Sequence, residues 1–190
     1  MIISFSGAAG SGKTTVGKEI SRQFGINFRP ELVDEVFDKH RIRPMETIST
    51  VTKEILRVYK QAQESLLAKM IEADNNVHSL DISVICDRSV VDVMAYYLFW
   101  CSGIASKEDF KSVEKVAKDH AKIYTSHVVF PVSDIIIDES FRSSNVVYQR
   151  AIYTMVLGIL DDWQLDHVIL KKSDVRSVSR EVAAIIKDNT

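Results

Sequence analysis

Short apolar runs alternate with longer amphipathic stretches along the whole chain. The runs have the length of buried strands, and the amphipathic stretches repeat their apolar residues every three to four positions, as helices do. The pattern predicts strands at residues 2–5, 26–29, 84–86, 127–132 and 167–170. It predicts helices at residues 13–24, 32–40, 46–73, 90–101, 107–124, 145–162 and 175–187. Strands that alternate with helices in this way are typical of an α/β fold with a five-stranded parallel sheet and helices on both faces.

Two of the predicted helices differ in the face that they bury. The helix at 46–73 has one apolar stripe, which we expect in the core, and Asn75 with Asn76 should end this helix. The stripe consists of Val51, Ile55, Val58, Ala62, Leu66 and Met70. The helix at 107–124 instead interleaves lysines with acidic residues. We interpret this second pattern as a solvated face rather than a track for nucleic acid.

The composition is that of a globular protein with one domain, which we place at residues 1–190. The chain is 46% apolar and 26% charged, and its 190 residues suffice for a real core. A net charge of −2 does not favour a protein that coats nucleic acid. It is still compatible with a local basic groove, because net charge does not describe how charges are distributed.

Cysteines, histidines and hydropathy give no sign of a disulfide, a transition-metal site or a membrane span. Cys86 and Cys101 do not form a C-x-x-C pair, so we expect buried, reduced thiols. The histidines form no metal-binding motif. The most apolar stretch, 93–101, has about half the length of a membrane span, and a strand at the N-terminus leaves no room for a signal peptide. We therefore expect a cytoplasmic protein without a membrane partner.

The first candidate functional motif lies at residues 6–15, between the first predicted strand and the first predicted helix. The pattern Gly-x-x-x-x-Gly-Lys-Thr in this strand–loop–helix context is typical of a loop that binds the phosphates of a nucleotide. The predicted loop comprises Gly7, Ala8, Ala9, Gly10, Ser11, Gly12, Lys13, Thr14 and Thr15. Its glycines can turn consecutive N–H groups around an anion, and the following helix points its positive end at the same place. An ordinary glycine turn would explain the glycines but not the Lys-Thr pair after them.

The residues after the glycines predict that the loop binds a nucleoside triphosphate together with Mg²⁺. Lys13 can reach the outer phosphates of a nucleotide, and the Thr14 hydroxyl can bind the metal. Two further strand ends should meet the loop, because ligands of open parallel sheets bind at the carboxyl ends of the strands. Glu31 follows the second predicted strand, and Asp87 follows the third.

Each of these strand-end residues has a structural alternative. Glu31 is either the base that takes the proton of the acceptor or a cap of the next helix, and Asp34 and Glu35 are the other candidates for the base. Asp87 either lies near the metal or caps the helix that follows it. Arg88 holds a phosphate or Glu31 itself, or else pairs with a surface acid.

Motifs elsewhere in the sequence distinguish between the classes of protein that have a phosphate-binding loop. A GTP switch needs an Asp three residues before a glycine outside the loop and an Asn-Lys-x-Asp guanine motif, and the chain has neither. Motor and helicase ATPases usually end a strand in paired acids, whereas this strand ends in Asp87-Arg88. A kinase needs cations around the moving phosphoryl group. Arg142 and Arg150 could supply them if the polar segment at 134–150 is a lid, and an ordinary exposed loop is the alternative.

Taken together, these motifs resemble those of the P-loop nucleoside and nucleotide kinases over most of the chain. The tetrapeptide Pro30-Glu31-Leu32-Val33 is similar to the Pro-Glu-Pro-Val of deoxynucleoside kinases, with Leu32 in place of the second proline. Asp87-Arg88-Ser89 is similar to their Glu-Arg-Ser and to the Asp-Arg-Tyr of thymidylate kinases. Residues 138–150 resemble the arginine-bearing lid of the nicotinamide-riboside-kinase-like group, without its dense arginine cluster.

The resemblance implies a three-layer P-loop NTPase fold and a kinase that uses ATP and Mg²⁺. It implies catalytic roles for Lys13, Glu31, Asp87, Arg88 and Arg142, nucleotide contacts from Arg150 and the loop, and a metal site at Thr14 and Asp87. The acceptor would be a nucleoside, a nucleoside monophosphate or a related compound. A kinase of hydroxymethyluracil in phage DNA and an ATP-binding regulatory module are the alternatives. The preference for ATP over GTP and the formation of a homodimer stay open.

Overall fold

The part of the chain that the structure describes forms one parallel sheet of five strands. The computed structural model describes residues 1–43, 45, 48, 50–132, 145–171 and 175–188. The strands are β1 (Ile2–Ser6), β2 (Asn27–Arg29), β3 (Val84–Asp87), β4 (Ser126–Val129) and β5 (His167–Ile169). Their order is β2-β3-β1-β4-β5, and every neighbouring pair is parallel. The five-stranded parallel sheet predicted from the sequence is confirmed.

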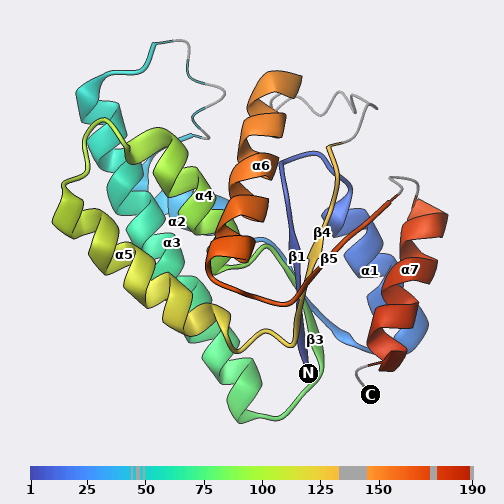
Figure 1. Cartoon of the computed structure of the whole chain (residues 1–190). Helices are drawn as coiled ribbons and strands as arrows, with labels where there is room; N and C mark the ends of the chain where they lie inside the picture. The colour runs from blue at the N-terminus through green and yellow to red at the C-terminus, as the bar shows by residue number, and fades with distance from the viewer. Residues whose placement is uncertain (44, 46–47, 49, 133–144, 172–174, 189–190) are drawn as a thin grey trace.

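Helices cover both faces of this sheet, as the alternating pattern predicted. They are α1 (Lys13–Phe24), α2 (Val33–His40), α3 (Lys53–Ser79), α4 (Val90–Cys101), α5 (Lys107–Ala121), α6 (Val146–Asp162) and α7 (Val175–Asp188). Figure 1 shows α1 and α7 on one side of the strands and α3, α4, α5 and α6 on the other. The structure therefore has three layers, with the sheet in the middle.

Each face of the sheet has its own apolar core. Ile3 and Phe5 of β1 face α1 and α7, where they pack with Val16, Ile20 and Val182. The residues that point to the other face pack against the larger set of helices. All five residues of β1 are buried, since this central strand has helices on both sides. A continuous apolar run is the sequence pattern that such a strand requires.

The longest helix differs from its prediction at both ends. α3 begins after Thr52, whose side chain accepts a hydrogen bond from the Ile55 N–H at 3.3 Å, rather than at residue 46. It runs through Asn75 and Asn76 to Ser79, so the predicted end was wrong. Asparagine is a weak helix former, but packing of the neighbouring turns overrides a propensity of this size.

The predicted apolar stripe of this helix was wrong at its first turns. Val51 precedes α3 and is 40% exposed, and Val58 is 36% exposed. The buried face begins instead at Tyr59 and continues through Ala62, Leu66 and Met70. The aromatic ring of Tyr59 packs beside Phe37, at a centroid distance of 5.6 Å, where the buried face of the helix begins.

The remaining boundaries and the cysteines agree more closely with the sequence. α5 ends at Ala121 rather than at 124, and β4 covers Ser126–Val129 rather than 127–132. The other ends lie within one residue of their predicted positions. Cys86 and Cys101 are both buried free thiols, as predicted.

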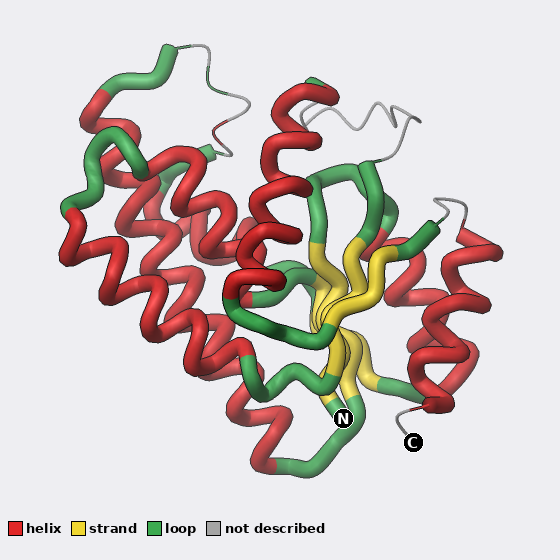
Figure 2. Tube along the Cα trace, viewed as in Figure 1, coloured by secondary structure: helices red, strands yellow, loops and turns green. Residues whose placement is uncertain are grey.

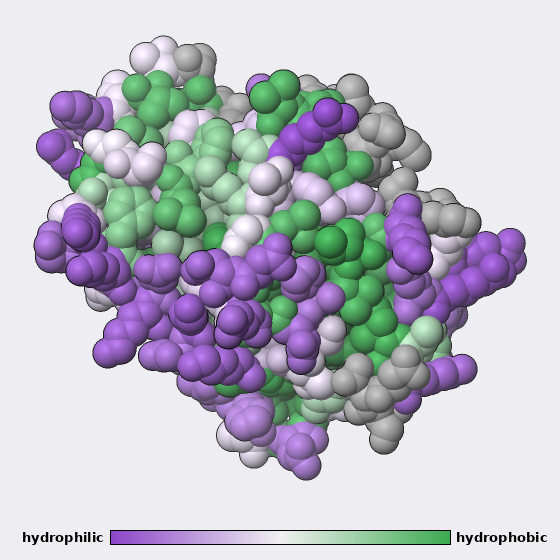
Figure 3. All heavy atoms as spheres, viewed as in Figure 1, coloured by the Kyte–Doolittle hydropathy of each residue, from purple (hydrophilic) through white to green (hydrophobic). Residues whose placement is uncertain are grey.

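The lysine-rich helix has a solvated face. Hydrophilic side chains follow the course of α5 across the surface in Figure 3, and Lys107, Lys111 and Lys115 are exposed. Within the described part of the chain, every helix is too short or too polar to cross a membrane.

A buried histidine makes the stability of the fold depend on pH. His127 of β4 is 1% exposed, and its Nδ1 lies 2.7 Å from the Ser4 hydroxyl oxygen of β1. Burial lowers the pKa of His127 from 6.5 to about 4. The unfolded chain therefore takes up a proton between pH 6.5 and pH 4 that the folded chain excludes, and folding loses about 3 kcal/mol as the pH falls through this window.

Replacing His127 by asparagine should remove this share of the acid sensitivity. We expect the free energy of unfolding of the wild type to fall by about 3 kcal/mol more than that of H127N between pH 7 and pH 4. Urea unfolding curves at both pH values measure the difference. His78, an exposed histidine at the end of α3, provides the control, because H78N should keep the wild-type slope. Equal slopes for H127N and the wild type would contradict the prediction.

Candidate functional site

The loop between β1 and α1 leaves the sheet at the edge where β2 and β3 also end (Figure 2). Gly7 has a φ of 130°, and a Cβ at this position would lie 2.7 Å from the Phe130 carbonyl oxygen. Gly12, at φ 89°, is the N-cap of α1, and because it is a glycine it has no side chain to cap the helix. Because no side chain caps the first N–H groups of α1, they suit an anion.

The side chain of Lys13 is folded into the loop. Its Nζ donates hydrogen bonds to the carbonyl oxygens of Gly7 at 3.0 Å and Ala8 at 2.7 Å, and to the Ser11 hydroxyl at 3.1 Å. Burial, with the nearby charge of Arg88, lowers the pKa of Lys13 to about 8. A buried ammonium whose direct partners are all uncharged is stabilised when an anion binds beside it.

Thr14 and Asp87 meet across the start of α1. The Thr14 hydroxyl donates a hydrogen bond of 2.5 Å to Asp87 Oδ2. Asp87 is fully buried, and its Oδ1 has no hydrogen-bond partner among the described residues. A hydroxyl beside a carboxylate with an unused oxygen is a donor set that fits Mg²⁺, which takes oxygen ligands and usually one or two carboxylates.

Glu31 and Arg88 form an ion pair on the other side of the loop. Arg88 Nε donates to Glu31 Oε1 at 2.5 Å, and the Glu31 side chain is 22% exposed. The guanidinium of Arg88 also stacks over the Tyr96 ring, 5.1 Å from its centroid. These contacts orient the carboxylate of Glu31 while leaving it open to solvent.

These side chains enclose one small cavity of about 50 Å³. It is lined by Ala9, Gly10, Ser11, Gly12, Lys13, Thr14, Thr15, Glu31, Asp87 and Arg88. The structure thus brings together the phosphate loop and the residues predicted at the ends of the second and third strands. Two carboxylates and two cations around one cavity are groups that phosphoryl transfer can use.

Other predicted residues lie away from this cavity. Asp34 is exposed on α2, and Glu35 pairs with Lys39 at 3.2 Å and with Lys69. Arg150 is exposed in the first turns of α6 and does not line the cavity. Arg142 and most of the predicted lid at 134–150 lie outside the described residues.

Two polar residues that sequence analysis missed contact the loop. Asp92 of α4 is fully buried: its Oδ1 accepts a hydrogen bond from the Gly7 N–H at 2.9 Å, and its Oδ2 accepts one from the Ser89 N–H at 2.9 Å. The spacing Ser89-x-x-Asp92 is that of a capping box, a signal that could have been recognised. Gln149 of α6 donates a hydrogen bond from Nε2 to the Ala9 carbonyl at 3.3 Å. No pattern in the sequence predicts this contact.

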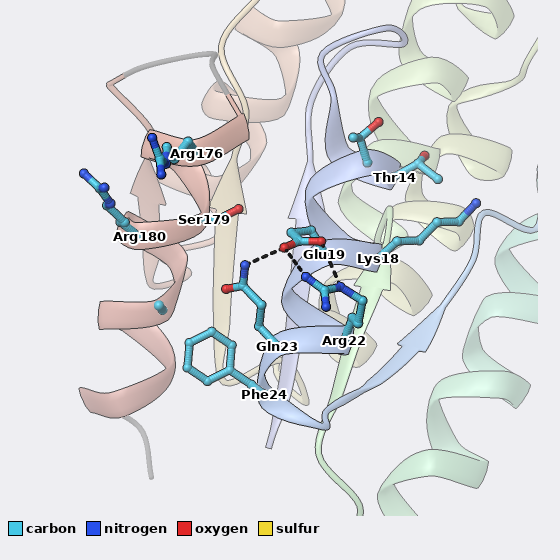
Figure 4. A pocket seen from close by; sticks show the side chains of 11 residues that line it. Thr14, Lys18, Glu19, Arg22, Gln23, Phe24, Arg176, Ser179 and Arg180 are labelled. Carbon is cyan, nitrogen blue, oxygen red and sulfur yellow. Dashed lines mark hydrogen bonds and ion pairs between the residues drawn. The ribbon is translucent and has the colours of Figure 1, made fainter.

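A wider hollow of about 1070 Å³ adjoins the loop between α1 and α7 (Figure 4). Thr14 and Thr15 line both this hollow and the small cavity. Glu19 lies in the hollow and is held by Arg22 at 2.9 Å and by Gln23 at 2.5 Å, while Arg176, Ser179 and Arg180 line it from α7. A ligand held by the loop therefore has space to extend past Thr15 toward α7.

Comparison with protein families gives one match over most of the chain. The model of an AAA domain matches residues 2–177. Among curated proteins, no sequence matches the chain.

Solved structures with the same fold include several kinases. The NadR protein in complex with NAD and AMP-PNP matches with a TM-score of 0.70 at 15% identity, over 98% of this chain and 48% of that one. The chain thus spans about half the length of NadR. Deoxyadenosine kinase from M. mycoides matches with a TM-score of 0.69 at 15% identity over 100% of both chains. Thymidylate kinase from Ehrlichia chaffeensis matches with a TM-score of 0.59 at 18% identity over 98% of both chains. The three-layer fold is that of the P-loop kinases, as the sequence predicted.

Proposed function

The chain belongs to the family of AAA domains, and within this family we propose that it acts as an ATP-dependent kinase. In this proposal it moves the γ-phosphate of ATP to a hydroxyl or phosphate of a nucleoside, a nucleoside monophosphate or a related acceptor. One observation carries the proposal: Glu31, Asp87 and Arg88, from two different strand ends, line the same cavity as the phosphate loop. A protein that only binds a triphosphate has no need of an oriented carboxylate opposite the loop.

The donor side of the cavity suits the charge of a triphosphate. The loop amides and Lys13 would hold the outer phosphates, since the amides stand at the start of α1 and the ammonium lies beside them. Thr14 and Asp87 would hold Mg²⁺, which neutralises phosphate charge when it is bound. Arg88 Nη1 lies 4.0 Å from Asp92 Oδ1 and makes no hydrogen bond with the described residues, so it would be the donor for a phosphoryl oxygen.

The acceptor side is built around Glu31. Its carboxylate would orient the acceptor hydroxyl and take its proton as the phosphoryl group arrives. Arg88 Nε fixes one oxygen of this carboxylate and so defines its direction. The named solved structures include kinases of a deoxynucleoside and of thymidylate, which makes nucleoside-like acceptors the first class to test.

A transfer assay with γ-labelled ATP and Mg²⁺ tests the proposal. The panel contains nucleosides, nucleoside monophosphates, nicotinamide riboside and hydroxymethylated DNA, each with a water-only control. We expect label on one small-molecule class, at a rate well above the release of free phosphate. Label on the DNA alone would assign the chain to the kinases of modified bases.

The family match favours a second candidate, an ATPase that acts as a regulatory module. Such a protein would release free phosphate in every arm of the panel and label no acceptor. Its rate would rise only when a partner protein is added. The transfer assay therefore separates the two functions by where the label is found.

Replacing Asp87 by asparagine should weaken the use of Mg²⁺. Asparagine keeps an acceptor for the Thr14 hydroxyl but loses the charge, and loss even of a partner in the outer shell of a metal typically costs about 10–100-fold in metal affinity or activity. A titration of Mg²⁺ at saturating ATP measures the expected shift in half-activation. Asp119, an exposed carboxylate of α5 that pairs with Lys122 at 3.4 Å, gives the control variant D119N. An unchanged Mg²⁺ requirement in D87N would remove Asp87 from the metal site.

A further inference from the structure

A buried ionic cluster lies behind the acceptor side of the site. Arg29, the last residue of β2, places its Nε 3.0 Å from Asp74 Oδ1 of α3, and the two side chains are 8% and 0% exposed. The two groups are not aligned as a hydrogen bond, so the contact is an ion pair. The second Asp74 oxygen accepts a hydrogen bond from Tyr124 Oη and lies 3.3 Å from His120 Nε2.

Asp74 keeps its charge despite being buried. Burial by itself raises the pKa of this carboxyl, but the hydrogen bonds from His120 and Tyr124 and the charge of Arg29 hold its pKa below the usual range. A buried ion pair is often no more stabilising than an apolar pair of the same volume. Stability alone is therefore a weak reason for this cluster.

Arg29 has a second contact, which connects the cluster to the site. Its Nη2 donates a hydrogen bond of 3.0 Å to the backbone carbonyl of Arg88. Arg88 has a φ of 73°, a left-handed conformation that is costly for a residue with a side chain. Its N–H donates to the Phe5 carbonyl at 2.9 Å. Both backbone polar groups of Arg88 are thus held by the ends of neighbouring strands.

We propose that Arg29 and Asp74 are positioning residues, which hold the Arg88 backbone so that its guanidinium meets Glu31. Asp74 fixes the guanidinium of Arg29, Arg29 fixes the carbonyl of Arg88, and Arg88 fixes Glu31 Oε1. Arg29 also stands two residues before Glu31 in the chain, so the contacts close a ring between the ends of β2 and β3. The effect on catalysis rests on the proposed function, whereas the effect on the Arg88–Glu31 contact does not.

The double variant R29M/D74N separates positioning from stability. Replacing Asp74 alone would leave a buried unpaired charge and would test folding. The double variant removes both charges, and its asparagine keeps an acceptor for Tyr124. We expect a folded protein whose kcat is about 10–100-fold lower, because a small displacement of a catalytic group has an effect of this size. KM for ATP should stay within about twofold, because the phosphate loop is untouched and binding of the donor is unchanged.

A second variant covers the case in which R29M/D74N does not fold. R29K keeps a charge for Asp74 but lacks the forked donor that reaches the Arg88 carbonyl at the same time. We expect the same fall in kcat from R29K with the ion pair retained. Val182→Ala, a core truncation of α7 on the opposite face of the sheet, is the control and should lower stability without lowering kcat.

An NMR measurement tests the same idea without any turnover. In protein labelled with ¹⁵N-arginine, the Arg88 Nε–H signal, assigned by Arg88→Lys, should be protected from exchange with water by its bond to Glu31. R29M/D74N or R29K should lose this protection, and V182A should keep it. A folded variant with wild-type kcat or with an unchanged Arg88 signal would overturn the inference. If the wild type labels no acceptor, the proposed function fails, and the NMR comparison still decides the positioning role.

Discussion

Replacing Lys13 by alanine should lower kcat by about 10²–10³-fold, the usual effect of removing one preorganised donor from a charge-stabilising site. Lys13 is the loop cation in this site, and its ammonium lies within 3.0 Å of the Gly7 and Ala8 carbonyls, where the phosphates of a bound nucleotide would also meet it. Arg88 cannot replace it, because its Nε is held by Glu31 and its Nη1 already has a separate place in the proposed site. Single-turnover transfer of γ-labelled phosphate measures the loss.

The control for this variant is Lys111→Ala, an exposed lysine of α5 on the far helix layer. It should keep the wild-type kcat and the wild-type affinity for ATP. Lys13→Ala should also remain folded, because relief of the desolvation cost of the buried ammonium offsets the loss of a donor to the Gly7 and Ala8 carbonyls. A folded K13A with wild-type kcat would exclude the loop lysine from phosphoryl transfer.

The phosphate loop was predictable because its chemistry is contiguous in the sequence. The spacing from Gly7 to Thr14 encodes the turn, the helix start and the two side chains that follow. The placement of Glu31 and Asp87 beside this loop was predictable for a different reason: the carboxyl ends of parallel strands meet at one edge of a sheet. Neither inference needed the packing of the helices.

Contacts between distant residues were not predictable from one sequence. Arg29 and Asp74 are separated by the whole of α2 and most of α3, and neither belongs to a motif. Their pairing depends on where α3 lies relative to the end of β2 and on the turn at which Asp74 faces inward. The same packing carries α3 past Asn75 and Asn76, where local propensity predicted an end. Burial and partner choice are decided by tertiary structure, which single-sequence patterns describe poorly.

Replacing Glu31 by glutamine should lower kcat by about 10²–10⁴-fold, the range that a general base contributes. Glutamine has nearly the shape of glutamate and keeps an oxygen for Arg88 Nε, so the variant removes the proton acceptor with little other change. The competing role, a cap of α2, would reduce stability and leave kcat intact. The N-cap of α2 is Leu32, and no side chain makes a capping bond there. Steady-state transfer rates and urea unfolding of the same samples measure the two effects separately.

Two neighbouring carboxylates serve as matched controls for Glu31→Gln. Asp34 is exposed, and Glu35 is engaged by Lys39 and Lys69, so D34N and E35Q should keep kcat within about twofold. KM for ATP should stay near the wild-type value in all three variants, since the phosphate loop and Lys13 are intact. Near-normal transfer by E31Q would exclude Glu31 as the base. A large loss in D34N or E35Q would then move the base one turn along α2, to a carboxylate that must swing toward the loop when the acceptor binds.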